Sequence, residues 1–142
     1  RCHKPAWPGV PSDARPLQDS GGRNMLTNRR KELTAALQII DRGDISASQM
    51  TGGWAGEIGQ VQFLPSSYVK HAVDFDGDGR RNLKTSVPDM LASTAKFLKS
   101  YGWKAGQPWG PGTANYAVIR DWNRAEVYQK TIAVMAQKLA GG

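Results

Sequence analysis

Residues 52–83 read GGWAGEIGQVQFLPSSYVKHAVDFDGDGRRNL, and this stretch is the most informative part of the sequence for the fold. Glycines near its start, Gly53 among them, let the backbone come close to a neighbouring segment or to a ligand. Gln60 and Gln62 follow, and a side-chain amide can donate and accept hydrogen bonds at once, which suits sugar hydroxyls and amides. Residues 55–67, AGEIGQVQFLPSS, hold a single acid, Glu57, and the question is whether this residue is a catalytic acid.

The run DFDGDG at residues 74–79 matches the start of a calcium-binding loop, in which oxygen ligands at alternate positions converge on one hard cation. The twelfth position, where a bidentate glutamate would close such a loop, is Thr85, so the closing carboxylate is expected to come from Asp89 instead. An acidic turn satisfied by water and by neighbouring arginines is the alternative. The predicted ligands of a structural Ca²⁺ or Na⁺ are Asp74, Asp76, Asp78, Arg80 through its carbonyl, and Asp89, with Asn82 as a further side-chain or water-mediated contact.

Aromatic residues lie mainly downstream of this stretch, and their flat faces could pack against pyranose rings. Each of them taken singly also fits a position in the core or at its rim, so both interpretations stay open. The residues are Trp54, Tyr101, Trp103, Trp109, Tyr116, Trp122 and Tyr128.

The 142 residues fit a single domain that can bury a hydrophobic core, and the net charge of +7 favours an anionic partner. Nucleic acid is not the expected partner, because the basic residues occur as scattered pairs such as Arg29-Arg30 rather than as a stripe. One cysteine excludes an internal disulfide. No stretch approaches the roughly 18 consecutive apolar residues of a membrane span.

The pattern of apolar and capping residues predicts a mainly α fold. Residues 1–24 contain four of the eight prolines, show no periodicity, and are expected to form an irregular arm or an appended remnant. Helices are predicted from Met25 to Gly43, from Ser86 to Gly102, and from Asn123 to Gly141. The predicted caps are Thr27 or Asn28 for the first helix and Ser86 with Asp89 for the second. The predicted apolar faces are Leu33, Ala36, Leu37 and Ile40; Leu91, Ala95 and Leu98; and Val127, Tyr128, Thr131, Ile132, Met135 and Leu139. Residues 114–119, ANYAVI, are the best strand candidate.

Three segments in this order resemble the lytic murein transglycosylases of the membrane-bound B type, which have a lysozyme-like catalytic domain. The first is residues 52–83, similar to that family's G-x-x-A-G-x-x-G-x-x-Q-F-x-P-S-S-Y pattern followed by its EF-hand-like cation loop. The second is SVPDMLASTAKFLKSYGWKAGQPW at 86–109, and the third is the Trp122-Asn123 pair with Tyr128. The resemblance extends over about residues 30 to 140 and implies that residues 25–142 form such a domain without its N-terminal part.

The resemblance implies cleavage of the β-1,4 bond between N-acetylmuramic acid and N-acetylglucosamine in peptidoglycan. A neutral carboxylic acid protonates the leaving oxygen, and the C6 hydroxyl of the muramoyl ring closes on the anomeric carbon to leave a 1,6-anhydro end. In the family this acid is a glutamate in an upstream Glu-Ser/Thr-x-x-Gly motif, which this chain does not contain. No catalytic residue is therefore assigned here, and Glu57 is expected to be structural or secondary, with Glu32 an even weaker candidate.

The substrate-binding residues that the resemblance implies are Gly53, Gln62, Phe97, Tyr116 and Tyr128. Phe97 stands where the family pattern tends to have a tyrosine. The implied partner is the glycan strand of peptidoglycan, with no organic cofactor and a monomeric state. The implied location is the periplasm or the outer membrane of a bacterium, reached through an anchor outside this sequence. A glycan-binding module without catalysis is the alternative, and an EF-hand-like calcium protein unrelated to the cell wall is a third interpretation.

Overall fold

The structure, a computed structural model, describes residues 22–53 and 56–141. These residues form α1 (Gly22–Asp41), a short 3-10 helix η1 (Ala47–Gln49), α2 (Pro65–His71), α3 (Val87–Ser100), α4 (Ala114–Trp122) and α5 (Glu126–Gly141). Within the described ranges the extended structure is limited to one isolated antiparallel bridge between Ile58 and Phe63. The prediction of a mainly α fold is confirmed.

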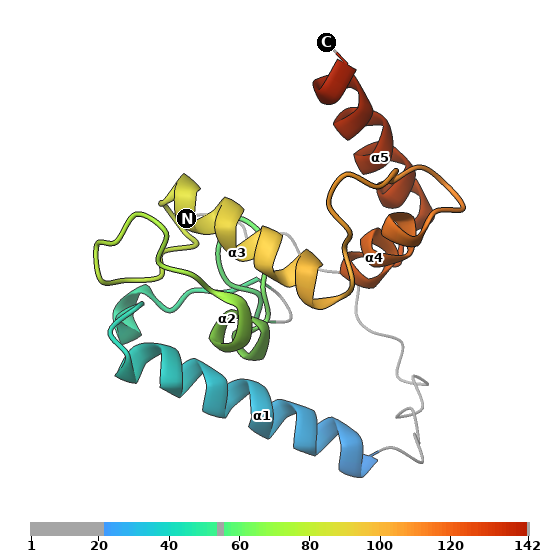
Figure 1. The fold of residues 1–142 in the computed structure, drawn as a ribbon. Coiled ribbons are helices and arrows are strands. Elements are labelled where there is room, and N and C mark those ends of the chain that lie inside the picture. The colour runs from blue at the N-terminus through green and yellow to red at the C-terminus, as the bar shows by residue number, and fades with distance from the viewer. Residues whose placement is uncertain (1–21, 54–55, 142) are drawn as a thin grey trace, which may run out of the picture.

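The helices pack in chain order, α1 on α2, α2 on α3, α3 on α4 and α4 on α5. Figure 1 shows α2 between α1 and α3, while α5 extends away from the rest of the chain. No helix within the described ranges combines the length and the apolar composition needed to cross a membrane.

The core lies where α2 meets α1, α3 and the loops on either side of α2. Its fully buried side chains include Ile39 from α1, Ile58 from the loop before α2, Tyr68 from α2 and Leu83 from the loop after it. The Tyr68 hydroxyl donates a hydrogen bond to the carbonyl oxygen of Arg81. Burial raises the pKa of Tyr68 above its ordinary value, so this hydroxyl stays protonated and remains a donor.

Helix α1 differs from the prediction at its start and in the face it buries. It begins at Gly22, so residues 22–24 are helical rather than part of the irregular arm, and Thr27 and Asn28 lie inside the helix and do not cap it. The rest of the predicted arm lies outside the described residues. Leu33 and Leu37 are 63% and 57% exposed, whereas Ala35 and Ile39 are 5% and 0% exposed. The end was predicted correctly, since Gly43 has φ +75° and its N–H donates to the Ile40 carbonyl at 2.9 Å.

Helix α2 was not predicted, because it is short and has no apolar periodicity. Pro65 occupies its first turn, where a missing N–H costs nothing. Glu32 of α1 caps this end: one carboxylate oxygen accepts from the Ser66 N–H at 2.9 Å and the other from the Ser66 hydroxyl at 2.7 Å. A negative charge at a helix N-terminus is stabilising, so Glu32 has a structural role in fixing α2 on α1.

Helix α3 confirms the predicted start but buries a different face. Ser86 is its N-cap and accepts from the Asp89 N–H at 3.3 Å, and Gly102 after its end has φ +96°. The buried residues are Asp89, Ser93 and Phe97, while Leu91 and Ala95 of the predicted face are exposed. Polar side chains are buried here because the backbone of the 74–89 loop needs hydrogen-bond acceptors.

Residues 114–119 belong to α4, so the prediction of a strand there was wrong. The Thr113 hydroxyl caps the helix by accepting from the Tyr116 N–H at 3.3 Å. The side chain of Asn115 then accepts from the Lys104 N–H and donates to the carbonyls of Lys104 and Gln107. These contacts fix the helix to the preceding loop, and they outweigh the β propensity of the valine, isoleucine and tyrosine.

Helix α5 was predicted with the correct end but with a different contact face. The buried residues of α5 are Gln129 and Ala133, and the Gln129 side chain donates to the Asn123 carbonyl at 3.0 Å. The predicted apolar face is instead exposed over the described residues, with Val127 and Leu139 the most exposed of its members.

Candidate functional site

A groove of about 430 Å³ lies where the loop before α2 meets the end of α3 and the α4–α5 junction. Residues from four separate segments meet there, so the groove exists only in the folded chain. We call it the central groove; its lining residues are Gln60, Val61, Gln62, Phe63, Leu64, Ser67, Phe97, Tyr101, Asp121, Trp122, Asn123 and Tyr128.

Aromatic rings form one wall of the central groove. Phe97 is buried at the centre, with its ring centroid 5.4 Å from that of Phe63 and 5.0 Å from that of Trp122. Tyr101 stacks on Phe97 at 4.5 Å between centroids and remains 45% exposed. An exposed tyrosine ring fixed by a buried partner is a suitable surface for a sugar ring.

His71 of α2 lies behind this wall. Its ring is 5.1 Å from that of Phe97. Burial, together with the charges of Lys70 and Lys96, lowers the pKa of His71 below its ordinary value of 6.5, so the ring is held in its neutral form. It therefore adds no charge behind the groove near neutral pH.

Polar side chains also line the central groove, among them Gln62, which has φ +53°. Gln62 is the only residue other than glycine with a positive φ in the ranges 22–53 and 56–141. Paired hydrogen bonds between Ile58 and Phe63, at 2.7 and 3.1 Å, hold the turn that contains it. A side chain in this conformation costs on the order of 1 kcal/mol or more, and such strain tends to occur at functional positions.

Gly59 fixes the position of the same turn. A Cβ at Gly59 would lie 2.5 Å from the Leu83 carbonyl oxygen, so only glycine permits this approach of the loop to residues 82–84. The Gln60 N–H donates to that same carbonyl at 3.0 Å. Gly59 therefore serves close backbone packing, as expected from the sequence.

Beside the central groove lies a smaller pocket of about 320 Å³, which we call the Glu57 pocket. It shares the lining residues Gln60 and Gln62 with the central groove, so the two spaces are neighbours. The Glu57 side chain lies against Gly53: a Cβ at Gly53 would be 2.6 Å from the Glu57 Oε2. The lining residues are Thr51, Gly52, Gly53, Glu57, Gly59, Gln60, Gln62 and Lys84.

Most of the predicted substrate-binding residues fall in these two spaces. Gln62, Phe97 and Tyr128 line the central groove, and Gly53 lines the Glu57 pocket. Tyr116 lines neither. Trp54, one of the aromatic candidates, lies outside the described residues.

Tyr101, which contributes the exposed ring of the groove, was named from the sequence only among the aromatic candidates and not among the substrate-binding residues. Its position four residues after Phe97, across the last turn of one helix, was the available signal, because residues at this spacing share a helix face.

A larger pocket of about 700 Å³ lies between residues 108–111 and α5. Its walls are Pro108, Trp109, Pro111, Ala133 and Val134 with few polar groups, Lys130 and Gln137 among them. It lacks the converging donors and acceptors that orient a saccharide, so the central groove is the better candidate for a polar polymer.

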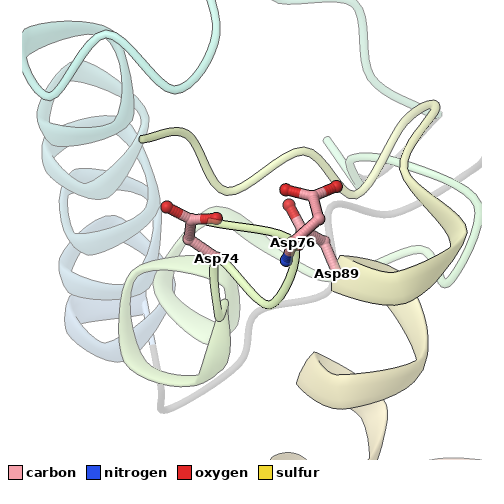
Figure 2. A group of neighbouring side chains, drawn as sticks. All are labelled: Asp74, Asp76 and Asp89. Carbon is pink, nitrogen blue, oxygen red and sulfur yellow. The ribbon is translucent and has the colours of Figure 1, made fainter. Parts of the chain in front are cut away.

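The loop after α2 brings three carboxylates together. One oxygen each from Asp74, Asp76 and Asp89 lies within 4.8 Å of the others. Figure 2 shows Asp74 and Asp76 on the loop and Asp89 at the first turn of α3. Sequence reasoning predicted all three as ligands.

These residues fit a hard cation in their chemistry, because carboxylate oxygens are the ligands that Ca²⁺ prefers. Asp89 also holds the loop by itself: Oδ1 accepts from the Phe75 N–H and Oδ2 from the Asn82 N–H, both at 2.7 Å. A carboxylate has further lone pairs for a cation beyond these two bonds.

The other two predicted ligands are not part of this group. Asp78 is outside the three-carboxylate group of the described residues, and its Oδ1 accepts from the Arg80 N–H at 2.8 Å. Asp74 accepts from the N–H groups of Gly77 and Gly79 at 2.8 and 2.9 Å. The loop is therefore folded by side-chain to backbone hydrogen bonds around its glycines, as in an Asx turn.

Comparison with known proteins gives matches along most of the chain. Residues 23–113 match the family described as Transglycosylase SLT domain. Over 57 residues, 40% of this chain and 16% of the other, the sequence is 47% identical to membrane-bound lytic murein transglycosylase B of Escherichia coli (strain K12).

Two solved structures illustrate the likeness in fold. SltB3 from Pseudomonas aeruginosa, solved in complex with NAG-anhNAM-pentapeptide, has a TM-score of 0.70 and 31% identity over 78% of this chain and 46% of its own. The Escherichia coli lytic transglycosylase Slt35, solved in complex with calcium, has a TM-score of 0.71 and 24% identity over 84% of this chain and 55% of its own.

The chain thus spans about half of each of these solved structures and a smaller part of the curated relative. The family match itself covers well over half of the present sequence, including α1, the glutamine-bearing turn, the acidic loop and α3. The chain belongs to the transglycosylase SLT domain family.

Proposed function

We propose that this chain is part of a peptidoglycan lytic transglycosylase and that its central groove holds the glycan strand beside the bond to be cleaved. The observation that carries the proposal is that Gln62, in its strained conformation, and the exposed ring of Tyr101 line the same groove. Amide and aromatic groups are the two kinds of contact that a sugar ring uses.

The family supports this assignment. The relatives matched above are named lytic transglycosylases, and one was solved with a peptidoglycan-like saccharide and peptide, NAG-anhNAM-pentapeptide. The net charge of +7 suits an anionic cell-wall polymer. The proposed location is correspondingly the bacterial periplasm or the outer membrane.

The groove positions the glycan, and the proton donor comes from a segment outside these residues. Bond cleavage requires a carboxylic acid kept neutral by an apolar setting, which gives its proton to the leaving oxygen and then takes one from the C6 hydroxyl. One described carboxylate lines each space: Asp121 in the central groove is exposed, and Glu57 in the Glu57 pocket stands among amides and Lys84. Neither setting is apolar, so neither residue is the proposed acid.

The acidic loop is proposed to bind Ca²⁺ or Na⁺ in a structural role, with Asp74, Asp76 and Asp89 as its carboxylate ligands and Asp78 and the Arg80 carbonyl completing the set. A calcium complex of the similar Slt35 supports the choice of cation. Bound there, the cation would neutralise the loop and hold it against α3. Asp74, Asp76 and Asp89 are not among the residues that line the central groove, so no catalytic step is assigned to the cation.

The experiment is mass spectrometry of the soluble products released from purified sacculi. The 142-residue chain is expected to release no 1,6-anhydromuropeptides, whereas a chain extended upstream to include a Glu-Ser/Thr-x-x-Gly motif releases them. Anhydro products from the short chain that disappear in Glu57→Gln would show that Glu57 is the acid and contradict this division of roles.

The second candidate is a glycan-binding module without catalysis, favoured by the polar setting of Glu57 and the exposure of Asp121. The same product analysis of sacculi distinguishes the two candidate functions. An extended chain that binds sacculi and releases no anhydro products would favour the module.

A further inference from the structure

The turn that carries Gln62 rests on the backbone of Leu83 and Lys84, two residues near the end of the loop between α2 and α3, which we call the platform. The Gln60 N–H donates to the Leu83 carbonyl at 3.0 Å, and the Gln60 side-chain amide donates to the Lys84 carbonyl at 2.9 Å. Gly59 lies so close that a Cβ there would be 2.5 Å from the Leu83 carbonyl oxygen. The platform therefore sets the position of the turn.

The half-buried Lys84 side chain fastens the platform to a third segment of the chain. Its ammonium donates to the Gln49 carbonyl at 2.8 Å and to the Thr51 hydroxyl at 3.1 Å. These acceptors stand 35 and 33 residues before Lys84 in the sequence, at the end of η1 and just after it. One residue thus joins η1 to the Gln62 turn, through its ammonium on one side and its carbonyl on the other.

The conformation of Gln62 has to be imposed by its surroundings. Its φ of +53° lies in the left-handed region, which is unfavourable for a residue other than glycine and persists only where the neighbouring structure fixes it. Within the turn, the Gln62 N–H donates to the Gly59 carbonyl at 3.2 Å, and paired bonds join Ile58 to Phe63. The contacts with the platform connect this local structure to the rest of the fold. Because Gln62 lines the central groove, its orientation there depends on the platform.

The platform has further anchors, so loss of the Lys84 ammonium should loosen it without unfolding the chain. The Leu83 side chain is 0% exposed, and the Lys84 N–H donates to the side-chain oxygen of Asn82 at 3.2 Å. The Asn82 N–H in turn donates to the Asp89 carboxylate at 2.7 Å. These contacts hold the backbone toward α3, whereas the Lys84 ammonium supplies the link to η1.

We propose that Lys84 is a positioning residue for glycan binding, which fixes the platform against residues 49–51 so that Gln62 is presented to the central groove in its strained conformation. This inference rests on the proposed function, because it concerns how the groove is held ready for the glycan strand. Lys84 is not among the residues that line the central groove. It acts through the turn that carries Gln62 and not by touching the sugar.

The test compares the wild-type chain with Lys84→Met, which keeps a long unbranched side chain and removes its donors. Calorimetric titration with chitotetraose should give an affinity about fivefold lower in the variant, because Gln62 then spends only part of its time in the binding conformation. In the chain without glycan, hydrogen exchange of the Gln60 N–H, followed by NMR, should be faster in the variant, because the carbonyl that accepts from it is less firmly held.

Three further variants separate positioning from a general effect of charge or folding. Lys84→Arg keeps charged donors at the end of a long stem and should restore most of the affinity and of the protection from exchange. Thr51→Val removes one of the two acceptors and should give smaller changes in the same direction. Lys138→Met removes the same charge from an exposed position on α5, outside both spaces, and should leave both measurements unchanged. A melting temperature close to that of the wild type shows that each variant is folded.

The outcomes distinguish this inference from the function on which it rests. Weaker binding by Lys84→Met with unchanged exchange of the Gln60 N–H would show that the lysine touches the sugar, and would overturn the positioning role. An affinity of Lys84→Met equal to that of the wild type would overturn the positioning role and leave the proposed function standing. A wild-type chain that does not bind chitotetraose would contradict the proposed function and this inference with it.

Discussion

Replacing Asp89 by alanine should cost a large part of the stability of the chain, even without a cation. Asp89 is 0% exposed, and its two oxygens accept from the N–H groups of Phe75 and Asn82 at 2.7 Å. A third contact, from the Asp76 N–H at 3.4 Å, is too long to add much. Hydrogen bonds to a charged acceptor contribute about 1.5–3 kcal/mol each, and the substitution leaves buried N–H groups without a partner.

The expected loss in the free energy of unfolding is therefore about 3–4 kcal/mol, which is a melting temperature lower by roughly 10 °C in a domain of this size. The assay is urea and thermal unfolding in EDTA, so that no cation contributes. Asp89→Asn keeps one acceptor and should lose about half as much.

The matched control is Asp78→Ala, in the same loop. Asp78 is exposed, and its side chain accepts from the Arg80 N–H at 2.8 Å. Its replacement should cost about 1 kcal/mol or less. Equal losses for Asp89→Ala and Asp78→Ala in EDTA would refute the reasoning that Asp89 holds the loop by hydrogen bonds.

Three further predictions concern the loop, the α1–α2 contact and the aromatic cluster. Millimolar Ca²⁺ added to the metal-free chain should raise its melting temperature, because a ligand that binds only the folded state stabilises that state. Asp76→Ala should abolish this rise. An unchanged melting temperature of the wild-type chain would contradict the cation site. Glu32→Gln should lower the free energy of unfolding, measured in urea, by about 1–2 kcal/mol, because it weakens the cap on Ser66 at the start of α2. The control is Glu126→Gln, which removes an exposed ion pair with Lys130 and should leave the free energy of unfolding unchanged within error. The unfolded chain takes up a proton on His71 near pH 6.5, and the folded chain does so only at lower pH, so the free energy of unfolding should fall as the pH drops below 6.5. His71→Gln should remove this pH dependence. An identical profile of stability against pH in the variant would exclude His71 as the origin of the dependence.

The ends of the helices could be predicted from the sequence more reliably than the faces they bury. Ser86 and Gly102 delimit α3 as expected, since capping and positive φ are local properties. The prediction of the buried face of α1 was wrong because Leu33 and Ile39 are similarly apolar, and which of them is buried depends on where α2 docks. That docking is fixed by Glu32 and Ser66, which are far apart in sequence.

The same difference between local and long-range features decided which residues of the candidate site could be predicted from the sequence. Gln62 and Asp89 were predicted because each stands in a local pattern of glycines, amides or acids. Tyr101 was named only among the aromatic candidates, whereas Tyr116 was given as a substrate-binding residue although it lines neither the central groove nor the Glu57 pocket. Aromatic residues carry no local sign of the cavity they face. The strand prediction at 114–119 failed for the related reason that the Thr113 cap and the Asn115 contacts, not intrinsic propensity, decide that segment.

The measurement that tests the central claim most directly is an NMR titration of the chain with chitotetraose, following backbone and side-chain amide signals. The account predicts the largest shifts at Gln60–Leu64 and at Tyr101, Trp122, Asn123 and Tyr128, which line the central groove. Shifts confined to the apolar pocket beside Trp109, or to the exposed face of α1 around Leu33, would contradict the assignment of the groove as the glycan site.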